Sequence, residues 1–221
     1  PLVDHVTGLG MQFGIWFEPE MVNAVSELYR AHPDWVLQID GRPLLESRNQ
    51  LVLDLTRQEV SDYLFAKIDA VLANHAVSYV KWDMNRDITH AGGRDGRAKF
   101  AAQTRVVYAL MDRVRAAHPD VEIESCASGG GRIDYGVLAR TQRVWTSDCI
   151  DALERLEIQR GASVFVPPEI LGSHISAIPN HQTGRRHTLA FRALVAIAYH
   201  FGVELNPLEL TEEERERSEE H

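Results

Sequence analysis

The segment Val77-Ser78-Tyr79-Val80-Lys81-Trp82-Asp83-Met84-Asn85-Arg86 predicts a β-strand that opens into a functional site. Apolar and β-prone residues lead into a lysine, a tryptophan and a carboxylate, and a polar loop follows. Side chains alternate between the two faces of a strand, so Lys81 and Asp83 share one face while Trp82 lies on the other.

The spacing of Lys81 and Asp83 leaves two interpretations open. A cation two residues from a carboxylate favours the ionised carboxylate, which suits a nucleophile. The same spacing also suits an ordinary ion pair at a strand end.

Strand, loop and helix alternate along the rest of the chain. This alternation is typical of βαβ units and a parallel sheet, in which sites lie after the strands. Further strands are expected at residues 11–17, 51–53, 121–125, 143–147, 170–175 and 203–205, and helices at residues 22–32, 56–74, 97–118, 153–160 and 186–201. Thr56 and Glu59 are expected to form a capping box at the start of the second of these helices, and Thr211 and Glu214 to cap a terminal helix.

The number of strands favours an incomplete barrel. A closed (β/α)8 TIM barrel needs eight strands and about 250 residues, and the first strands are missing here. An open doubly wound sheet is the alternative, but no strand is followed by a G-x-G-x-x-G turn. We expect an α/β fold in which residues 1–210 form a partial (β/α)8 catalytic barrel of about six βα units. Residues 211–221 are expected to form a charged C-terminal helix or tail.

The composition excludes several classes of protein. The 221 residues are 44% hydrophobic and 25% charged, as in a globular domain with a sizeable core. The net charge of -9 argues against a nucleic-acid partner. No apolar run reaches the roughly 18 residues of a membrane helix, and no secretory signal is expected. Two cysteines provide no disulfide framework, which favours a reducing, cytoplasmic location.

Two aspartates at strand ends are candidates for glycoside hydrolysis, which uses a pair of carboxyl groups. Asp83 and Asp148 each follow a tryptophan-containing segment, and tryptophan suits the C–H faces of sugars. The alternative is that either aspartate caps the segment after it.

The segment Glu124-Ser125-Cys126-Ala127-Ser128-Gly129-Gly130-Gly131-Arg132 predicts a loop whose backbone can approach a ligand closely. A phosphate loop is disfavoured because the Lys-Ser/Thr of a Walker motif is absent. Cys126 is favoured as a contact or packing group over a nucleophile.

No metal site is expected, because the histidines lack a metal-binding spacing such as H-E-x-x-H. Glu18 and Glu20 flank Pro19 at a strand end. One could line the site and the other cap a helix, and the sequence does not distinguish them.

Five motifs together resemble glycoside hydrolase family 36, whose members are chiefly microbial α-galactosidases. They are Phe17-Glu18-Pro19-Glu20-Met21-Val22, Arg48-Asn49-Gln50-Leu51-Val52-Leu53-Asp54, Lys81-Trp82-Asp83-Met84-Asn85-Arg86, the glycine-rich segment above, and Trp145-Thr146-Ser147-Asp148. They occur in the order of the family.

The resemblance implies a retaining exo-α-galactosidase that acts on melibiose or raffinose without a cofactor. Asp83 matches the nucleophile and Asp148 the general acid/base. The substrate-binding positions that carry over are Trp16, Arg48, Lys81, Cys126 and Gly129. The resemblance also implies a homo-oligomer for the full-length enzyme.

The chain departs from the family in one motif. Two adjacent aspartates in an Asp-Asp-Gly-Trp-like motif bind the 4- and 6-hydroxyls in the family, and this chain has no such motif. A catalytically silent fragment that lacks part of the sugar pocket is therefore one alternative. A galactosyl transferase of the raffinose- or stachyose-synthase kind, which shares the nucleophile and differs in what attacks the intermediate, is another.

Overall fold

A computed structural model describes residues 2–212, 214 and 215. The chain divides into two compact units. The first comprises Pro1–Ser128 and Arg132–Gln142, and the second comprises Gly129–Gly131 and Arg143–His221.

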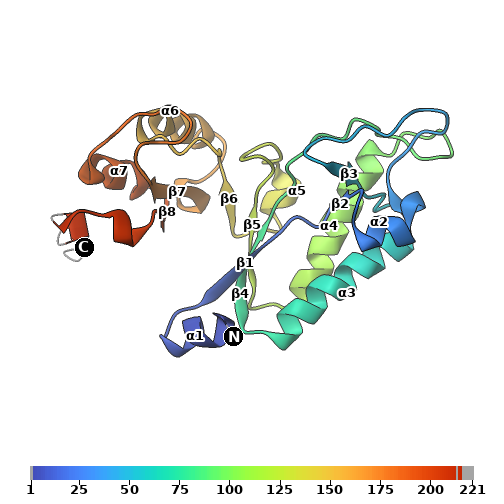
Figure 1. Ribbon diagram of the computed structural model, residues 1–221, viewed down its shortest axis with the longest axis horizontal. Helices are drawn as coiled ribbons and strands as arrows, with labels where there is room; N and C mark the ends of the chain where they lie inside the picture. The colour runs from blue at the N-terminus through green and yellow to red at the C-terminus, as the bar shows by residue number, and fades with distance from the viewer. Residues whose placement is uncertain (1, 213, 216–221) are drawn as a thin grey trace. The chain divides into compact units, whose positions relative to one another are not determined.

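The first unit contains three parallel strands, β1, β4 and β5, with β4 in the middle (Figure 1). Strands β2 and β3 form a separate antiparallel pair. In chain order the elements are α1 (Leu2–Gly8), β1 (Phe13–Phe17), β2 (Met21–Asn23), α2 (Glu27–Ala31), the 3-10 helix η1 (Pro33–Trp35), β3 (Gln50–Val52), α3 (Gln58–Asn74), β4 (Val77–Trp82), α4 (Phe100–Ala117), β5 (Glu122–Ser125) and α5 (Tyr135–Leu138).

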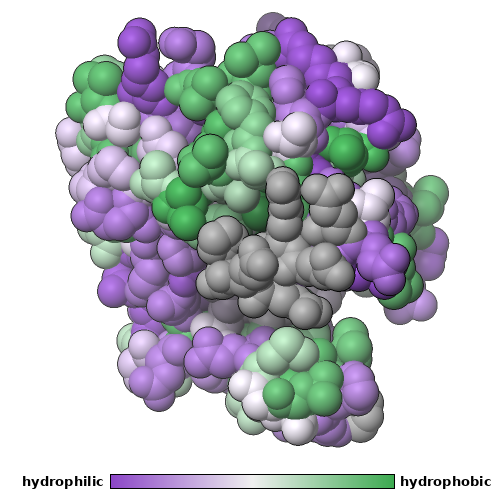
Figure 2. Space-filling model, turned by 90° about the vertical axis from the view of Figure 1, so that its left-hand side faces the viewer, coloured by the Kyte–Doolittle hydropathy of each residue, from purple (hydrophilic) through white to green (hydrophobic). Residues whose placement is uncertain are grey.

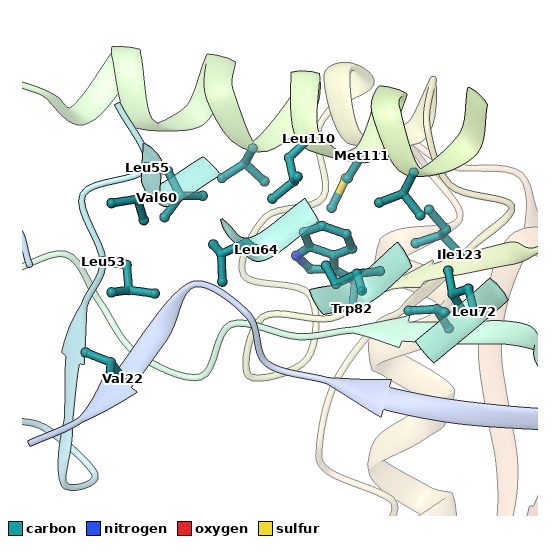
Figure 3. Packing of buried hydrophobic residues seen from close by; sticks show 14 of the residues in the cluster. Val22, Leu53, Leu55, Val60, Leu64, Leu72, Trp82, Leu110, Met111 and Ile123 are labelled. Carbon is teal, nitrogen blue, oxygen red and sulfur yellow. The ribbon is translucent and has the colours of Figure 1, made fainter. Parts of the chain in front are cut away.

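The core of this unit lies on the face of β4 opposite Lys81. Val80 and Trp82 are fully buried there, and Ile123 of β5 is buried beside them. Helices α3 and α4 pack side by side and cover this face with Leu64, Leu110 and other apolar side chains (Figure 3). The predicted alternation of faces along β4 is therefore confirmed.

The second unit also contains three parallel strands, in the order β6, β7 and β8. Helices α6 and α7 pack against β7. The elements are β6 (Arg143–Trp145), α6 (Ala152–Ala162), the 3-10 helix η2 (Pro168–Ile170), β7 (Leu171–Ser176), α7 (Leu189–Ala196), β8 (His200–Glu204) and the 3-10 helix η3 (Pro207–Glu209).

The parallel α/β class is confirmed, and six strands pair in parallel. Closure into an eight-stranded barrel and the domain boundary at residue 210 stay predictions. Strands β1 and β8 keep large apolar side chains in solvent, as unpaired sheet edges do: Trp16, Phe201 and Val203 are about half exposed, at 51%, 46% and 57%. Figure 2 shows hydrophobic residues at the surface of the molecule among hydrophilic ones.

Three predicted helices differ from the structure. Residues 22–32 begin in β2, and only Glu27–Ala31 are helical. The helix predicted over residues 186–201 ends at Ala196, because residues 200–204 form β8. Helix α3 starts at Gln58 without the predicted Thr56–Glu59 capping box.

The side chains of the failed capping box have other partners. The Thr56 hydroxyl donates to Asp54, and Glu59 pairs with Arg57. Thr211 and Glu214 do form the reciprocal hydrogen bonds of a capping box. Most of the predicted terminal helix, residues 213 and 216–221, lies outside the described residues. No described helix has the length and apolar character needed to cross a membrane.

Candidate active site

Three strands of the first unit contribute one side chain each to a row across the sheet. The register pairs Trp16 of β1 with Lys81 of β4, and Lys81 with Glu124 of β5. Neighbouring residues of a parallel sheet point to the same face, so the three side chains form one surface. Lys81, the middle member of the row, lies two residues before Asp83, at the carboxyl ends of the strands.

The carboxylate of Asp83 is buried and surrounded by hydrogen-bond donors. Only 5% of the residue is exposed. Its Oδ2 accepts from the Trp16 indole Nε1 at 3.0 Å and from Asn85 Nδ2 at 2.6 Å. Its Oδ1 accepts from the backbone N–H of Met84 at 2.8 Å, and the Cys126 thiol donates to the same carboxylate.

These donors decide the charge of Asp83. Burial alone would raise the pKa of the carboxyl, since it disfavours the charged form. The hydrogen bonds from Trp16, Asn85, Cys126 and Met84 outweigh burial, so the pKa of Asp83 lies below its ordinary value of 3.8. Asp83 is therefore a carboxylate at neutral pH.

Lys81 forms its ion pair with Glu124 and not with Asp83, the partner that the sequence suggested. Lys81 Nζ lies 3.3 Å from Glu124 Oε1, its neighbour in the row. The Tyr79 hydroxyl donates to the other oxygen of Glu124. Glu124 is 2% exposed and the Lys81 side chain 26% exposed, so a buried carboxylate holds an ammonium group that still reaches the surface.

Asn85 is a neighbour of Asp83 that the sequence did not single out, and Glu18 is one of the two glutamates that it left open. Asn85 donates to Asp83, and its Oδ1 accepts from the backbone N–H of Ser128 at 3.0 Å. Glu18 Oε1 accepts from the backbone N–H of Asn85 at 3.1 Å. Glu18, which follows β1 in the chain, is thus hydrogen-bonded to the loop after β4.

Glu20 belongs to the core instead. It is 1% exposed and accepts from Trp82 Nε1 at 3.0 Å, and it also pairs with Arg132. Glu20 therefore does not cap a helix, and a role of Glu18 in lining a sugar site stays a prediction. A period of two would place residues 18 and 20 on the same face of a strand, so no local signal distinguishes them; both lie between the end of β1 and the start of β2.

Cys126 follows β5 and is buried at 2% exposure. Its backbone N–H donates to the carbonyl of Trp82 at 2.8 Å, which places its thiol beside Asp83. No disulfide joins Cys126 to Cys149, both of which the structure describes. Cys126 therefore contacts the carboxylate of Asp83, and its contact with a sugar stays a prediction.

Arg48 lies in a two-residue turn between Ser47 and Gln50, which exchange backbone hydrogen bonds of 3.2 and 2.9 Å. The φ angles of Arg48 and Asn49 are 55° and 58°. Both are positive, as in type I′ turns. The left-handed region is strained for a bulky residue such as arginine. The side chain of Arg48 is exposed and makes no ion pair with the described residues.

Asp148 lies in the second unit, three residues after the end of β6. Its Oδ1 accepts from the indole Nε1 of Trp145 at 3.0 Å, and the residue is exposed. Gly129 packs onto the backbone beside it. A Cβ on Gly129 would lie 2.6 Å from Ser147 Cα and 3.0 Å from Asp148 N, and its φ is +84°. Only glycine fits this approach.

Arg155 of α6 holds the segment that carries Asp148. Its guanidinium donates to the carbonyls of Ser147 and Cys149, and it lies 4.4 Å from the Trp145 ring centroid. Arg155 is 2% exposed, and burial lowers its pKa to about 10. The carbonyls on both sides of Asp148 are thus fixed by one buried cation.

The structure therefore places the predicted site residues in two groups. Trp16, Lys81, Cys126 and Asp83 come together in the first unit, and the Arg48 turn is bonded to the same loops. Gly129 and Asp148 come together in the second unit. No group of three or more His, Cys, Asp or Glu side chains within the described residues is arranged to hold a metal ion.

Comparison with known proteins gives a consistent result. The family model described as Melibiase matches residues 1–221. The α-galactosidase of Escherichia coli is 52% identical over 208 residues, which cover 94% of this chain and 29% of that protein. α-Galactosidase AgaA of Geobacillus stearothermophilus is 46% identical over 220 residues, which cover 97% of this chain and 30% of AgaA. The chain thus spans under a third of the length of these relatives.

Solved structures agree with the sequence comparison. The crystal structure of the GH36 α-galactosidase AgaA superposes with a TM-score of 0.95 at 46% identity, over 99% of this chain and 31% of that chain. A variant of AgaA in complex with raffinose superposes with a TM-score of 0.95 at 45% identity, with the same coverage of 99% and 31%.

Proposed function

The chain belongs to the Melibiase family, and on this premise we propose that it carries the catalytic groups of a retaining exo-α-galactosidase. The enzyme releases terminal α-linked galactose from oligosaccharides such as melibiose and raffinose. It works through a covalent galactosyl-aspartate and needs no cofactor.

The observation that carries this proposal is the state of Asp83. A nucleophile must be ionised, and Asp83 is a buried carboxylate whose pKa is held below its ordinary value. It lies beside the indole of Trp16, which is 51% exposed and can stack on a sugar face. A solvated capping aspartate would have neither feature.

The reaction proceeds in two displacements. In the first, a carboxylate oxygen of Asp83 attacks the anomeric carbon and the glycosidic C–O bond breaks, while Asp148 gives its proton to the leaving oxygen. In the second, Asp148 takes a proton from water, whose oxygen attacks the anomeric carbon and releases Asp83. Retention requires the two carboxyl groups to be about 5 Å apart.

The proposed sugar contacts are those that the resemblance to glycoside hydrolase family 36 implies. Lys81 and Arg48 are cationic donors for sugar hydroxyls, and Trp16 lines the pocket. Cys126 and Gly129 lie against the 2-hydroxyl in this proposal and leave no room for an N-acetyl group. Galactose is therefore preferred over N-acetylgalactosamine. The raffinose complex of the AgaA variant makes an oligosaccharide with terminal galactose the first substrate to test.

The proposal extends to the setting of the enzyme. Cysteines without a disulfide fit a reducing compartment, so we place the reaction in the cytoplasm. The active enzyme is proposed to be a homo-oligomer.

Covalent labelling tests the proposal. The active polypeptide that carries this chain is incubated with a galactose-configured mechanism-based inactivator and digested for mass spectrometry. The expected result is one adduct, on Asp83. A glucose-configured inactivator is the control and should label far more slowly. An adduct on another carboxylate, or none while a homologous α-galactosidase is labelled, would refute the assignment. Product analysis with sucrose as acceptor separates hydrolysis from galactosyl transfer.

A further inference from the structure

We propose that Arg86 and Glu18 are positioning residues that hold the Arg48 turn in its sugar-binding geometry by bonding it to the loop of the nucleophile. We call Arg86 and Glu18 the brace. The inference rests on the proposed function, because that function makes Arg48 a hydroxyl donor.

The Arg48 turn needs external support. Two consecutive non-glycine residues with positive φ are strained, and such a conformation persists only where the surroundings fix it. The backbone hydrogen bonds between Ser47 and Gln50 close the turn but do not fix its position. The side chain of Arg48 provides no anchor, because it is exposed and forms no ion pair with the described residues.

Arg86 supplies the first support. Its Nη1 donates to the backbone carbonyl of Gln50, directly after the turn, and both Nη atoms lie 3.3 Å from the carbonyl of Leu45, just before it. Nη2 also donates to the Thr89 hydroxyl at 3.0 Å. The residue is 9% exposed. One planar guanidinium thus donates hydrogen bonds to the chain on both sides of the turn, a geometry that lysine cannot reproduce.

Glu18 supplies the second support. Its Oε2 accepts from the side-chain Nε2 of Gln50 at 2.7 Å, and its Oε1 accepts from the backbone N–H of Asn85 at 3.1 Å. Asn85 in turn donates to Asp83. One carboxylate therefore joins the residue after the Arg48 turn to the loop that holds the nucleophile.

The two supports have the same consequence. Arg86 is three residues beyond Asp83, and Glu18 accepts a hydrogen bond from Asn85, which lies between these two residues. Both supports therefore connect the turn to the loop after β4. The hydroxyl donor and the nucleophile are then set in one rigid arrangement. Misplacement of a binding group by about 1 Å can lower activity by as much as 100-fold.

A double-mutant cycle in the active polypeptide tests the brace. Arg86→Lys is expected to raise KM for an α-galactoside by about tenfold and to lower kcat less, and Arg48→Ala is expected to have the same effect. In the Arg48→Ala background, Arg86→Lys should change KM by less than about twofold, because the side chain that it positions is gone. Effects that multiply in the double variant would overturn the proposal.

The single variant Gln50→Met gives a second, milder test. It removes the Gln50–Glu18 hydrogen bond and leaves the bonds of Glu18 to Asn85 and of Asn85 to Asp83 in place. KM should rise and kcat stay close to wild type. A fall in kcat at unchanged KM would contradict the proposal. Arg57→Lys is the matched control, because Arg57 also bonds a carbonyl and carboxylates but lies outside the site, and both constants should stay unchanged.

A readout that needs no activity separates this proposal from the proposed function. Amide hydrogen exchange at Ser47 and Gln50, whose N–H groups close the turn, should become at least about fivefold faster in Arg86→Lys, while exchange in α3 and α4 stays as in wild type. Unchanged exchange in the turn would overturn the brace. A wild-type protein that cleaves no α-galactoside would refute the proposed function, and the exchange experiment would still decide about the brace.

Discussion

The two candidate catalytic aspartates are held in opposite ways. Asp83 and Asp148 each follow a parallel strand, and each accepts a hydrogen bond of 3.0 Å from an indole N–H. Asp83 is buried and has three more donors on its carboxylate, whereas Asp148 is exposed. Asp148 is fixed instead through its backbone, by the approach of Gly129 and by Arg155.

The difference fits the two tasks that we propose for these residues. A nucleophile must stay ionised while a sugar excludes water, so direct donors to its carboxylate are useful. A general acid/base must gain and lose a proton in every cycle, and many donors to its carboxylate would hinder protonation. Contacts to the backbone on both sides of Asp148 set its position and leave its carboxylate exposed.

The largest expected effect comes from removing the nucleophile. Asp83→Gly should lower turnover by roughly a thousandfold or more, since no covalent intermediate can form. Added azide should then enter from the vacated side and give β-galactosyl azide, which chromatography and NMR identify. If azide instead rescued Asp148→Ala to the β product, the two roles would be reversed.

A smaller effect is expected from loosening the backbone that carries Asp148. Arg155→Met should lower kcat for raffinose by about ten- to a hundredfold. Hydrolysis of an aryl galactoside with a good leaving group should fall much less, because its departure needs little acid assistance. Arg160→Met on the same helix, whose side chain is 80% exposed, should leave both rates unchanged. Equal losses on both substrates would argue against a role in positioning the acid.

The smallest effect concerns stability. Gly129→Ala should lower the free energy of unfolding by about 3 kcal/mol, because it adds backbone strain and a contact of 2.6 Å with Ser147. Gly184→Ala, at φ +71° with no atom within 4 Å of the new Cβ, tests strain alone and should lower it by about 1 kcal/mol. Urea unfolding measures both. Equal losses would show that the approach to Ser147 is not tight.

The strand that carries Asp83 could be predicted because a period of two is a local property. Alternation placed Lys81 and Trp82 on opposite faces, and the structure confirms it. The partner of Lys81 could not be predicted. Glu124 is 43 positions away in the sequence, and it reaches Lys81 only through the register of β4 with β5.

The Arg48 turn shows a second limit. A type I′ turn is predicted from glycine or asparagine at its central positions, and arginine gives no such signal. The geometry depends on bonds from Arg86 and Glu18, which lie 38 and 30 positions away. The capping box predicted at Thr56 fails for a local reason, because Asp54, two residues earlier, accepts the hydrogen bond of the Thr56 hydroxyl.

The row of Trp16, Lys81 and Glu124 has a consequence for insertions and deletions. Each strand contributes one residue to the row, so deleting a single residue within β4 would bring its other face forward. The Trp82 indole would then replace the ammonium group beside Glu124, and the carboxylate would lose its cation. Length changes in the loops between the strands leave the row intact. Related sequences can therefore differ in the length of the loops between the strands. Within each strand we expect substitutions but no insertions or deletions.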